Sequence, residues 1–370
     1  MTLPLGDLRV LTGGAESRRQ GFDPMIENPG DPWHRRLNYP RLWQSLYPLG
    51  VTPDHTTVLG IALIFLFLTG VCLVLPNPSG GILVLVIAAI LSPATLLGVE
   101  RGNVDLLMFF LVSLSVVAAH RWPAVSAATV FSGFALKLFP LFACAVLLRA
   151  SRSTFLRLIL VLLVAATVYI VLTYSDLALI RTATQKGIVF SYGIDVFWMS
   201  LPAGNWSARM LSYLVVLLAF FWGFTALRRD DVQSERQKEP IYLDAFRAGA
   251  AIYLGTFFFG NNWDYRLIFL ILPIPQLAIW AGGSERHASV SSMVVLSSML
   301  LSLWYLEIAR FTGRVMFADV PVCFLLDQLY KWAVFAGLLF LFLWSMPGWV
   351  KGSVRELNSQ LSRIYANRRR

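Results

Sequence analysis

Apolar runs of about 20 residues recur along this chain from Thr57 to Trp344, and each is long enough to cross roughly 30 Å of hydrocarbon as a helix. Hydrophobic residues make up 57% of the 370 residues and charged residues only 14%, which is far more apolar than a typical soluble domain. Lipid cannot satisfy exposed backbone N–H and C=O groups, whereas a helix satisfies them internally. We therefore predict an all-α, polytopic helical bundle in a membrane.

The window length gives about ten membrane spans. We expect them at 57–76, 81–99, 104–120, 123–149, 154–174, 206–227, 241–260, 264–282, 288–308 and 324–347.

The formal net charge of +10 raises the question of nucleic acid, but the Lys and Arg residues lie mostly in short loops and in the C-terminal tail. That distribution is typical of cytoplasmic loops, and we expect no nucleic-acid partner. We divide the chain into an outer loop region at 1–55, a helical bundle at 56–349 and a basic cytoplasmic tail at 350–370. The tail would lie on inner-leaflet lipids of the plasma membrane.

Residues 123–149 present a conflict of orientation, because Arg121 and Arg149 flank one apparent span and both are expected in the cytoplasm. Lys137 and Pro140 interrupt the same span. Proline ends or kinks a helix, and a lysine within an apolar stretch is costly and often functional. We predict a short helical hairpin that turns near Lys137 and Pro140, which brings the total to ten or eleven membrane segments.

This topology gathers charged side chains at the extracytoplasmic face. They are Asp7, Arg101, Asp105, Lys137, Asp264 and Arg266. Cations bind phosphate and a carboxylate can accept a proton, so such a set suits a site that handles a lipid-linked anion.

Several segments resemble the bacterial branch of polyprenyl-phosphate-mannose-dependent α-mannosyltransferases, within the GT-C superfold of glycosyltransferases. They are Gly6-Asp7-Leu8-Arg9-Val10, Gly21-Phe22-Asp23-Pro24, Asn38-Tyr39-Pro40, Glu100 to Leu107, Leu136-Lys137-Leu138-Phe139-Pro140 and Gly260 to Ile268. The resemblance runs from about residue 6 to residue 345 and rests on the order and spacing of these motifs.

The resemblance implies transfer of a hexose, mannose in that family, from a polyprenyl-phosphate donor to a lipid or glycan acceptor of the cell envelope. The reaction inverts the anomeric centre and uses no cofactor or metal. By position, Asp7 is the catalytic base. Three cations are implied to bind the donor phosphate, namely Lys137, Arg101 and Arg266. The implied substrate-binding residues are Tyr39, Asn103, Asp105, Asn262 and Asp264.

One departure from the family concerns the N-terminus. The family places a membrane helix before the loop that carries the aspartate, whereas here Met1 stands six residues before Asp7. We expect either a start codon assigned downstream of the true one or a natural truncation. A catalytically inactive family member is therefore one alternative function.

A transporter or lipid flippase is another alternative, since charged residues in a membrane can mark a substrate path. Transporters commonly carry paired repeats with broken helices in matching positions. This sequence has one such interruption, and its charged residues gather on one face, which favours an enzyme.

Ordinary structural roles remain open for the same residues. Asp7, Asn103 and Asp105 are residue types that begin helices, and Lys137 could extend to the headgroups. The residues near Asp264 could form a local ion pair. Basic residues beside Trp33 are typical of headgroup anchoring, and Asp244 with Arg247 is expected to be a structural pair.

Overall fold

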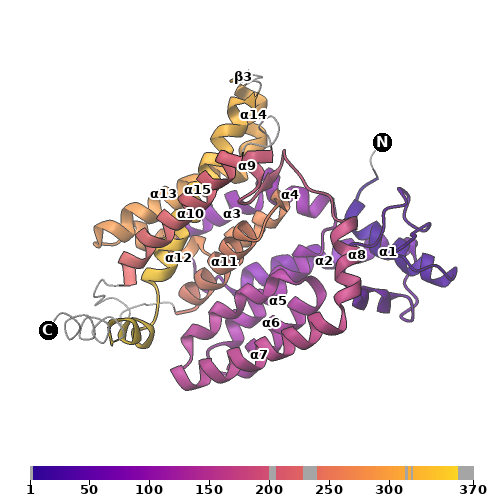
Figure 1. The fold of residues 1–370 in the computed structure, drawn as a ribbon, viewed down its shortest axis with the longest axis horizontal. Coiled ribbons are helices and arrows are strands. Elements are labelled where there is room, and N and C mark those ends of the chain that lie inside the picture. Colours follow the sequence, from indigo (N-terminus) through magenta and orange to yellow (C-terminus); the bar gives the residue numbers. More distant parts are fainter. Residues whose placement is uncertain (1–2, 200–205, 228–239, 313–315, 318–319, 357–370) are drawn as a thin grey trace.

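Helices form nearly all of the regular structure in the computed structural model, which describes residues 3–199, 206–227, 240–312, 316–317 and 320–356 (Figure 1). The α-helices are α1 (Gly6–Arg19), α2 (Thr56–Leu73), α3 (Gly80–Ile90), α4 (Pro93–Glu100), α5 (Asp105–Ala118), α6 (Pro123–Lys137), α7 (Arg152–Leu172), α8 (Tyr174–Ala183), α9 (Val196–Met199), α10 (Trp206–Leu227), α11 (Pro240–Phe258), α12 (Ile274–Ala281), α13 (Arg286–Leu303), α14 (Tyr305–Thr312) and α15 (Val322–Trp344). The 3₁₀ helices are η1 (Arg41–Leu46), η2 (Pro53–His55), η3 (Phe139–Arg149) and η4 (Asp264–Ile271). Two short antiparallel pairs join β1 (Ser191–Tyr192) to β2 (Asn262–Trp263) and β3 (Met316–Phe317) to β4 (Val320–Pro321). The prediction of an all-α chain is confirmed.

Within the described residues, four helices are long and apolar enough to cross a membrane, namely α2, α7, α10 and α15. The number rises to six if two bent pairs each form one span: α3 with α4, bent by 52°, and η4 with α12, bent by 58°. These helices fit a multi-pass membrane protein. A count of ten or eleven segments stays a prediction.

Local chemistry explains the bend between α3 and α4. The Ser92 hydroxyl caps α4 by accepting a hydrogen bond from the Thr95 backbone N–H, and Pro93 occupies the first turn of that helix. Proline fits a first turn because its missing N–H has no partner there in any case. An apolar stretch of the expected length is thus divided into two helices.

The chain turns back between α6 and η3, as the sequence predicted near Lys137 and Pro140. Helix α6 ends at Lys137, and η3 begins at Phe139 with Pro140 in its first turn. At the far end of η3, Arg149 lies 3.0 Å from the Nδ1 atom of His120, which immediately precedes Arg121. The start of α6 and the end of η3, the two arms of the hairpin, therefore lie at the same level. Arg121 and Arg149 share one end of the molecule.

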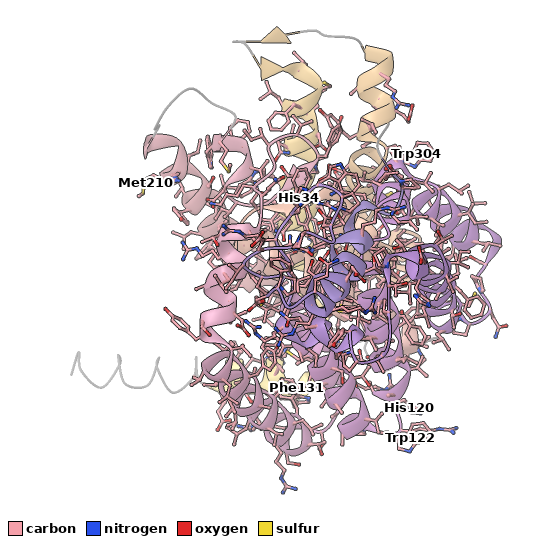
Figure 2. The ribbon with its side chains drawn as sticks, turned by 90° about the vertical axis from the view of Figure 1, so that its right-hand side faces the viewer. His34, His120, Trp122, Phe131, Met210 and Trp304 are labelled. Atoms are coloured by element: carbon pink, nitrogen blue, oxygen red, sulfur yellow. The ribbon has the colours of Figure 1, made fainter. Side chains whose placement is uncertain are left out.

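That end also contains a buried structural pair. Arg149 donates a hydrogen bond of 2.8 Å to Asp244 on α11, and Arg247 lies 3.8 Å from the same carboxylate. Figure 2 shows His120 near the bottom of the molecule, well below Trp304 and below His34 of the N-terminal region.

The helices form two groups joined by α11. Helices α5, α6 and α7 lie side by side, while α10 and α13 both pack against α15 (Figure 1). Helix α11 contacts η3 and α5 on one side and α15 on the other. One large apolar core runs through both groups and includes Phe109, Phe246 and Phe335, and a second, small cluster joins Val196 to Phe324.

The first 55 residues are more ordered than the expected loop, because they contain the buried helix α1 as well as η1 and η2. Leu8, Leu11 and Tyr39 belong to the same core as the bundle. The Thr12 and Thr56 hydroxyls meet at 2.8 Å and join α1 to α2. Of the basic tail at 350–370, residues 357–370 lie outside the described part of the chain.

Candidate functional site

The position of Asp7 is fixed by the connection between α4 and α5. The Asp7 backbone N–H donates to the Arg101 carbonyl at 2.8 Å, and the Leu5 N–H donates to the Glu100 carbonyl at 2.8 Å. Gly102 has a φ of +58°, and a Cβ there would lie 3.1 Å from Leu5 and Leu8. Glycine at this turn therefore lets the start of α1 approach the α4–α5 connection closely.

The Asp7 carboxylate is bound by two side chains from that connection. Arg101 donates from Nη2 to Oδ1 at 2.7 Å and from Nε to Oδ2 at 3.1 Å. Asn103 donates from Nδ2 to Oδ2 at 2.6 Å. Hydrogen bonding to Asp7 raises the pKa of the Arg101 guanidinium, which remains cationic.

Asp105, in the first turn of α5, is buried and joins two cations from distant parts of the chain. Its carboxylate lies 2.6 Å from Lys137 Nζ at the end of α6 and 3.3 Å from Arg266 Nε in η4. Lys137 also donates to the Asn103 side-chain oxygen at 3.1 Å. Asn103 therefore connects the ion pair of Asp7 to that of Asp105.

Arg266 is oriented by the β1–β2 pair. Its Nη1 atom donates to Oδ1 of Asn262, whose own amide donates to the Thr256 carbonyl at 2.6 Å. Asn262 pairs with Tyr192 across the two strands. The Arg266 guanidinium also lies 4.4 Å from the ring centre of Phe139, within cation–π range.

Aromatic rings surround the Lys137 ammonium. Its Nζ lies 5.1 Å from the ring centre of Tyr39 and 5.9 Å from that of Tyr265. Burial, together with the nearby Asp7 carboxylate, raises the pKa of the Tyr39 phenol well above its usual range. Tyr39 thus stays protonated and can donate a hydrogen bond from its hydroxyl group.

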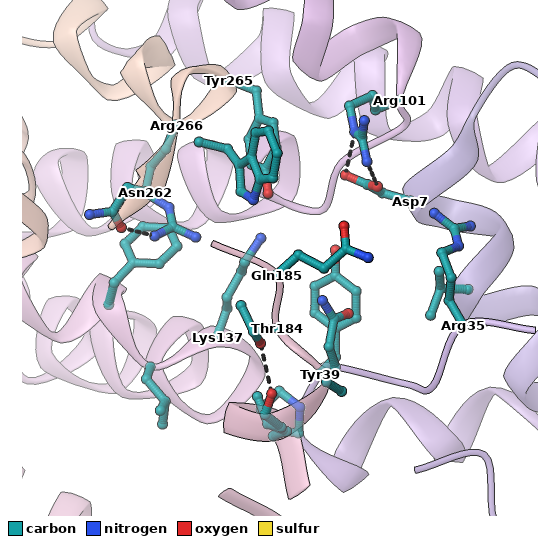
Figure 3. A pocket seen from close by; sticks show the side chains of 18 of the residues that line it. Asp7, Arg35, Tyr39, Arg101, Lys137, Thr184, Gln185, Asn262, Tyr265 and Arg266 are labelled. Atoms are coloured by element: carbon teal, nitrogen blue, oxygen red, sulfur yellow. Dashed lines mark hydrogen bonds and ion pairs between the residues drawn. The ribbon is translucent and has the colours of Figure 1, made fainter. Parts of the chain in front are cut away.

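These side chains border a cavity of about 310 Å³, shown in Figure 3. Asp7 and Arg101 form one side of it, and Asn262 and Arg266 form another. Thr184 and Gln185, just beyond α8, complete the wall. Eight of the nine residues predicted for the site therefore lie in this pocket or directly behind it. They are Asp7, Tyr39, Arg101, Asn103, Asp105, Lys137, Asn262 and Arg266.

Asp264 is the exception, since it points away from the pocket and into the bundle. Lys331 of α15 donates to both of its carboxylate oxygens, at 2.8 and 3.0 Å. Lys331 also lies 2.6 Å from Asp327 and donates to the Ser191 carbonyl at 3.1 Å. The Lys331 side chain is fully buried, so this group ties α15 to both β1 and the start of η4.

Lys331 and Asp327 were not among the residues predicted for the site. They stand four residues apart within the apolar run 324–347, a spacing that places them on one face of a helix. A lysine in an apolar span is the same signal that identified Lys137, and it was available here.

Two arginines at the pocket edge have different surroundings. Arg35 is tied to Asp31 at 2.8 Å, donates to the Gly6 carbonyl at 2.6 Å and stacks on Trp33. Arg36 is exposed and forms no ion pair with any residue in the described ranges.

A wall of the pocket is anchored by Arg41. Its guanidinium bridges Asp23 of the N-terminal region and Asp176 of α8, at 3.0 Å in each case. This bridge holds α8, and with it Thr184 and Gln185, beside the N-terminal region.

The pocket combines one largely buried carboxylate, that of Asp7, with several cations, an arrangement suited to proton transfer next to a bound anion. No three His, Cys, Asp or Glu side chains are placed to hold a metal ion in the part of the chain that the structure describes.

Comparison with protein-family models, with curated proteins and with solved structures finds no match to this chain.

Proposed function

We propose that this chain is a membrane glycosyltransferase that moves a hexose from a polyprenyl-phosphate donor to a hydroxyl group of a lipid or glycan acceptor. The observation that carries the proposal is the composition of the pocket, whose lining has Asp7 as its one carboxylate beside five cations among the described residues. The resemblance to the GT-C mannosyltransferases favours mannose as the hexose that is transferred.

Asp7 is the proposed general base, and its hydrogen bonds indicate which oxygen takes the proton. Among the residues that the structure describes, Oδ2 already accepts from Arg101 and Asn103, whereas Oδ1 accepts only from Arg101. Because a carboxylate oxygen has two acceptor positions, Oδ1 keeps one free for the acceptor hydroxyl group.

The reaction follows from that assignment. The acceptor oxygen attacks the anomeric carbon as Asp7 Oδ1 takes its proton, and the bond from that carbon to the phosphate oxygen breaks. The phosphate leaves with the electron pair, and the anomeric configuration inverts.

Cations stabilise the leaving phosphate in this proposal. Lys137 has three N–H donors, of which two face Asp105 and Asn103, so the third is free for the ligand. Arg266 uses Nε for Asp105 and Nη1 for Asn262, which leaves Nη2 for the ligand. Fixed donors of this kind lower the barrier where negative charge develops.

We assign the pocket to the extracytoplasmic face of the plasma membrane. Helix α6 carries Lys137 at its pocket end, and Arg121 and Arg149 lie at the opposite end, about 20 Å away by the rise of a helix. Clustered basic residues favour the cytoplasm, and this supports an outer position for the pocket.

The test compares the full chain with its Asp7→Asn variant in nanodiscs, using polyprenyl-phosphate-mannose and membrane lipid acceptors. We expect transfer to fall by at least about 100-fold in the variant, the usual contribution of a general base, with donor binding retained. Asp54→Asn, at an exposed aspartate of η2, is the matched control and should keep full activity.

Unchanged transfer in Asp7→Asn would show that another group is the base. Absence of transfer by the wild-type chain, across several sugars and acceptors, would contradict the enzyme assignment and favour a transporter or an inactive relative.

A further inference from the structure

The pocket carries more positive than negative charge. Its lining includes five cations: Arg35, Arg36, Arg101, Lys137 and Arg266. The carboxylates in contact with them are three, namely Asp7, Asp31 and Asp105. Two positive charges are therefore uncompensated by the contacts of the lining residues.

The surplus charges have definite locations. One belongs to the Lys137 and Arg266 pair, because both cations share the single carboxylate of Asp105. The other belongs to Arg36, which is exposed at the pocket edge and has no ion-pair partner in the described part of the chain. An anion at Lys137 and Arg266 would displace no existing ion pair, and Arg36 lies in the lining of the same pocket.

The size and edge of the pocket indicate the rest of the ligand. A cavity of about 310 Å³ is at the small end of the range for ligand pockets, so it suits a headgroup and not a long chain. One edge is apolar, formed by Leu138, Phe139 and Ile180, and Leu138 is 37% exposed. An alkyl chain can leave the pocket across this edge toward lipid.

We propose that the pocket binds an alkyl phosphate monoester, a dianion, more tightly than the corresponding phosphodiester, a monoanion. The inference rests on the proposed function to the extent that the donor is a diester and the transfer releases a monoester. The charge surplus then matches the product phosphate and not the donor.

This match has a consequence for catalysis. As the bond to the anomeric carbon breaks, the phosphate changes from one negative charge to nearly two at neutral pH. Contacts that strengthen with this change lower the barrier, and the same contacts retain the product. The released monoester is therefore a competitive inhibitor of its own formation.

Binding is measured on the purified full chain by calorimetry with three probes: octyl phosphate, methyl octyl phosphate and inorganic phosphate. We expect octyl phosphate to bind on the order of tenfold more tightly than its methyl ester, as one further charge near a partly exposed cation allows. Inorganic phosphate should bind more weakly than octyl phosphate because it lacks the chain. Equal affinity for the two esters would overturn the charge argument, and equal affinity for octyl and inorganic phosphate would overturn the lipid ligand.

Two variants and a control sharpen the result. Arg36→Gln should reduce the preference for the monoester severalfold, whereas Arg18→Gln, at an exposed arginine of α1 outside the pocket lining, should leave it unchanged. Asp7→Asn removes a negative charge from the pocket, so it should increase monoester affinity even as it abolishes transfer. Loss of monoester affinity in Asp7→Asn would contradict the inference.

These measurements need no turnover, so they separate the two proposals. A monoester preference without sugar transfer would leave the phosphate site standing while refuting the transferase. Sugar transfer without a monoester preference would support the transferase and refute the proposed preference of the phosphate site.

Discussion

Arg101 binds Asp7 through two hydrogen bonds, of 2.7 and 3.1 Å, and so fixes both the position and the plane of the carboxylate. A lysine cannot reproduce this paired geometry, although it keeps the charge. The effect of the pair on catalysis should therefore depend on geometry more than on charge.

Arg101→Lys is expected to lower kcat by roughly tenfold with a smaller change in KM for the donor, because Asp7, the proposed base, is no longer oriented while the positive charge remains. Steady-state kinetics of both quantities tests this expectation. Arg310→Lys, at an exposed ion pair of α14, serves as the control. A rise in KM at constant kcat would instead make Arg101 a contributor to ground-state donor binding.

Asp105→Leu should destabilise the protein by about 3–5 kcal/mol, since it leaves Lys137 and Arg266 without their shared carboxylate in a buried site. Thermal unfolding in detergent measures the loss. Ser132→Ala, on the exposed face of α6, should change stability by no more than about 0.5 kcal/mol. A stable Asp105→Leu variant would indicate that water already compensates the two cations.

The group around Lys331 predicts an order of effects. Lys331→Met leaves Asp264 and Asp327 buried without a cation and should cost about 3–5 kcal/mol. Asp264→Asn should cost less, because Lys331 keeps Asp327 as its partner and the amide can still accept a hydrogen bond. Comparison of the unfolding transitions of the two variants gives the order, and the reverse order would contradict this account of the group.

Asp264→Asn should also leave the KM for the donor within about twofold of wild type, if the protein is kept below its unfolding transition. The reason is that Asp264 does not line the pocket. A large change in KM would restore the substrate-binding role that its motif suggested.

Gly133→Ala tests the hairpin. A Cβ at Gly133 would lie 2.9 Å from Cβ of Pro140, so the two arms must separate and stability should fall by about 1–3 kcal/mol. Gly81→Ala, in the first turn of α3, has no atom within 4 Å of the added Cβ and should be neutral or slightly stabilising. Equal stability of the two variants would mean that the hairpin tolerates repacking.

The hairpin could be predicted because its signals are local. Pro140 cannot continue a helix, Lys137 is costly in an apolar run, and the flanking arginines favour the same side of the membrane. The lengths of the apolar runs could also be read from the sequence, but the bends within them could not. The bends lie at short breaks such as Ser92-Pro93 and Pro273, which barely change the mean hydropathy of a window.

Helix α1 was not anticipated because its sequence is polar and contains Gly13 and Gly14. Tertiary contacts override that weak propensity: a Cβ at Gly13 would lie 2.5 Å from the Gly30 carbonyl oxygen, so the helix and the following loop pack backbone to backbone.

The position of Asp264 depended on a partner far away in the sequence. Lys331 lies 67 residues further along the chain and binds the Asp264 carboxylate inside the bundle. Arg266, two residues after Asp264, faces the pocket instead. The sequence motif predicted the correct end of the molecule for Asp264 and Arg266. It could not predict that the two side chains point in different directions.

The shared carboxylate of Asp105 also sets an order for biosynthesis. Lys137 follows Asp105 by 32 residues, so their ion pair can form while Arg266, 161 residues after Asp105, is still to be translated. Arg266 then docks onto an assembled N-terminal half and brings β2 with it. The pocket is therefore the last part of this region to mature, and a nascent chain stalled before residue 266 would hold the Asp7 pair without a completed site.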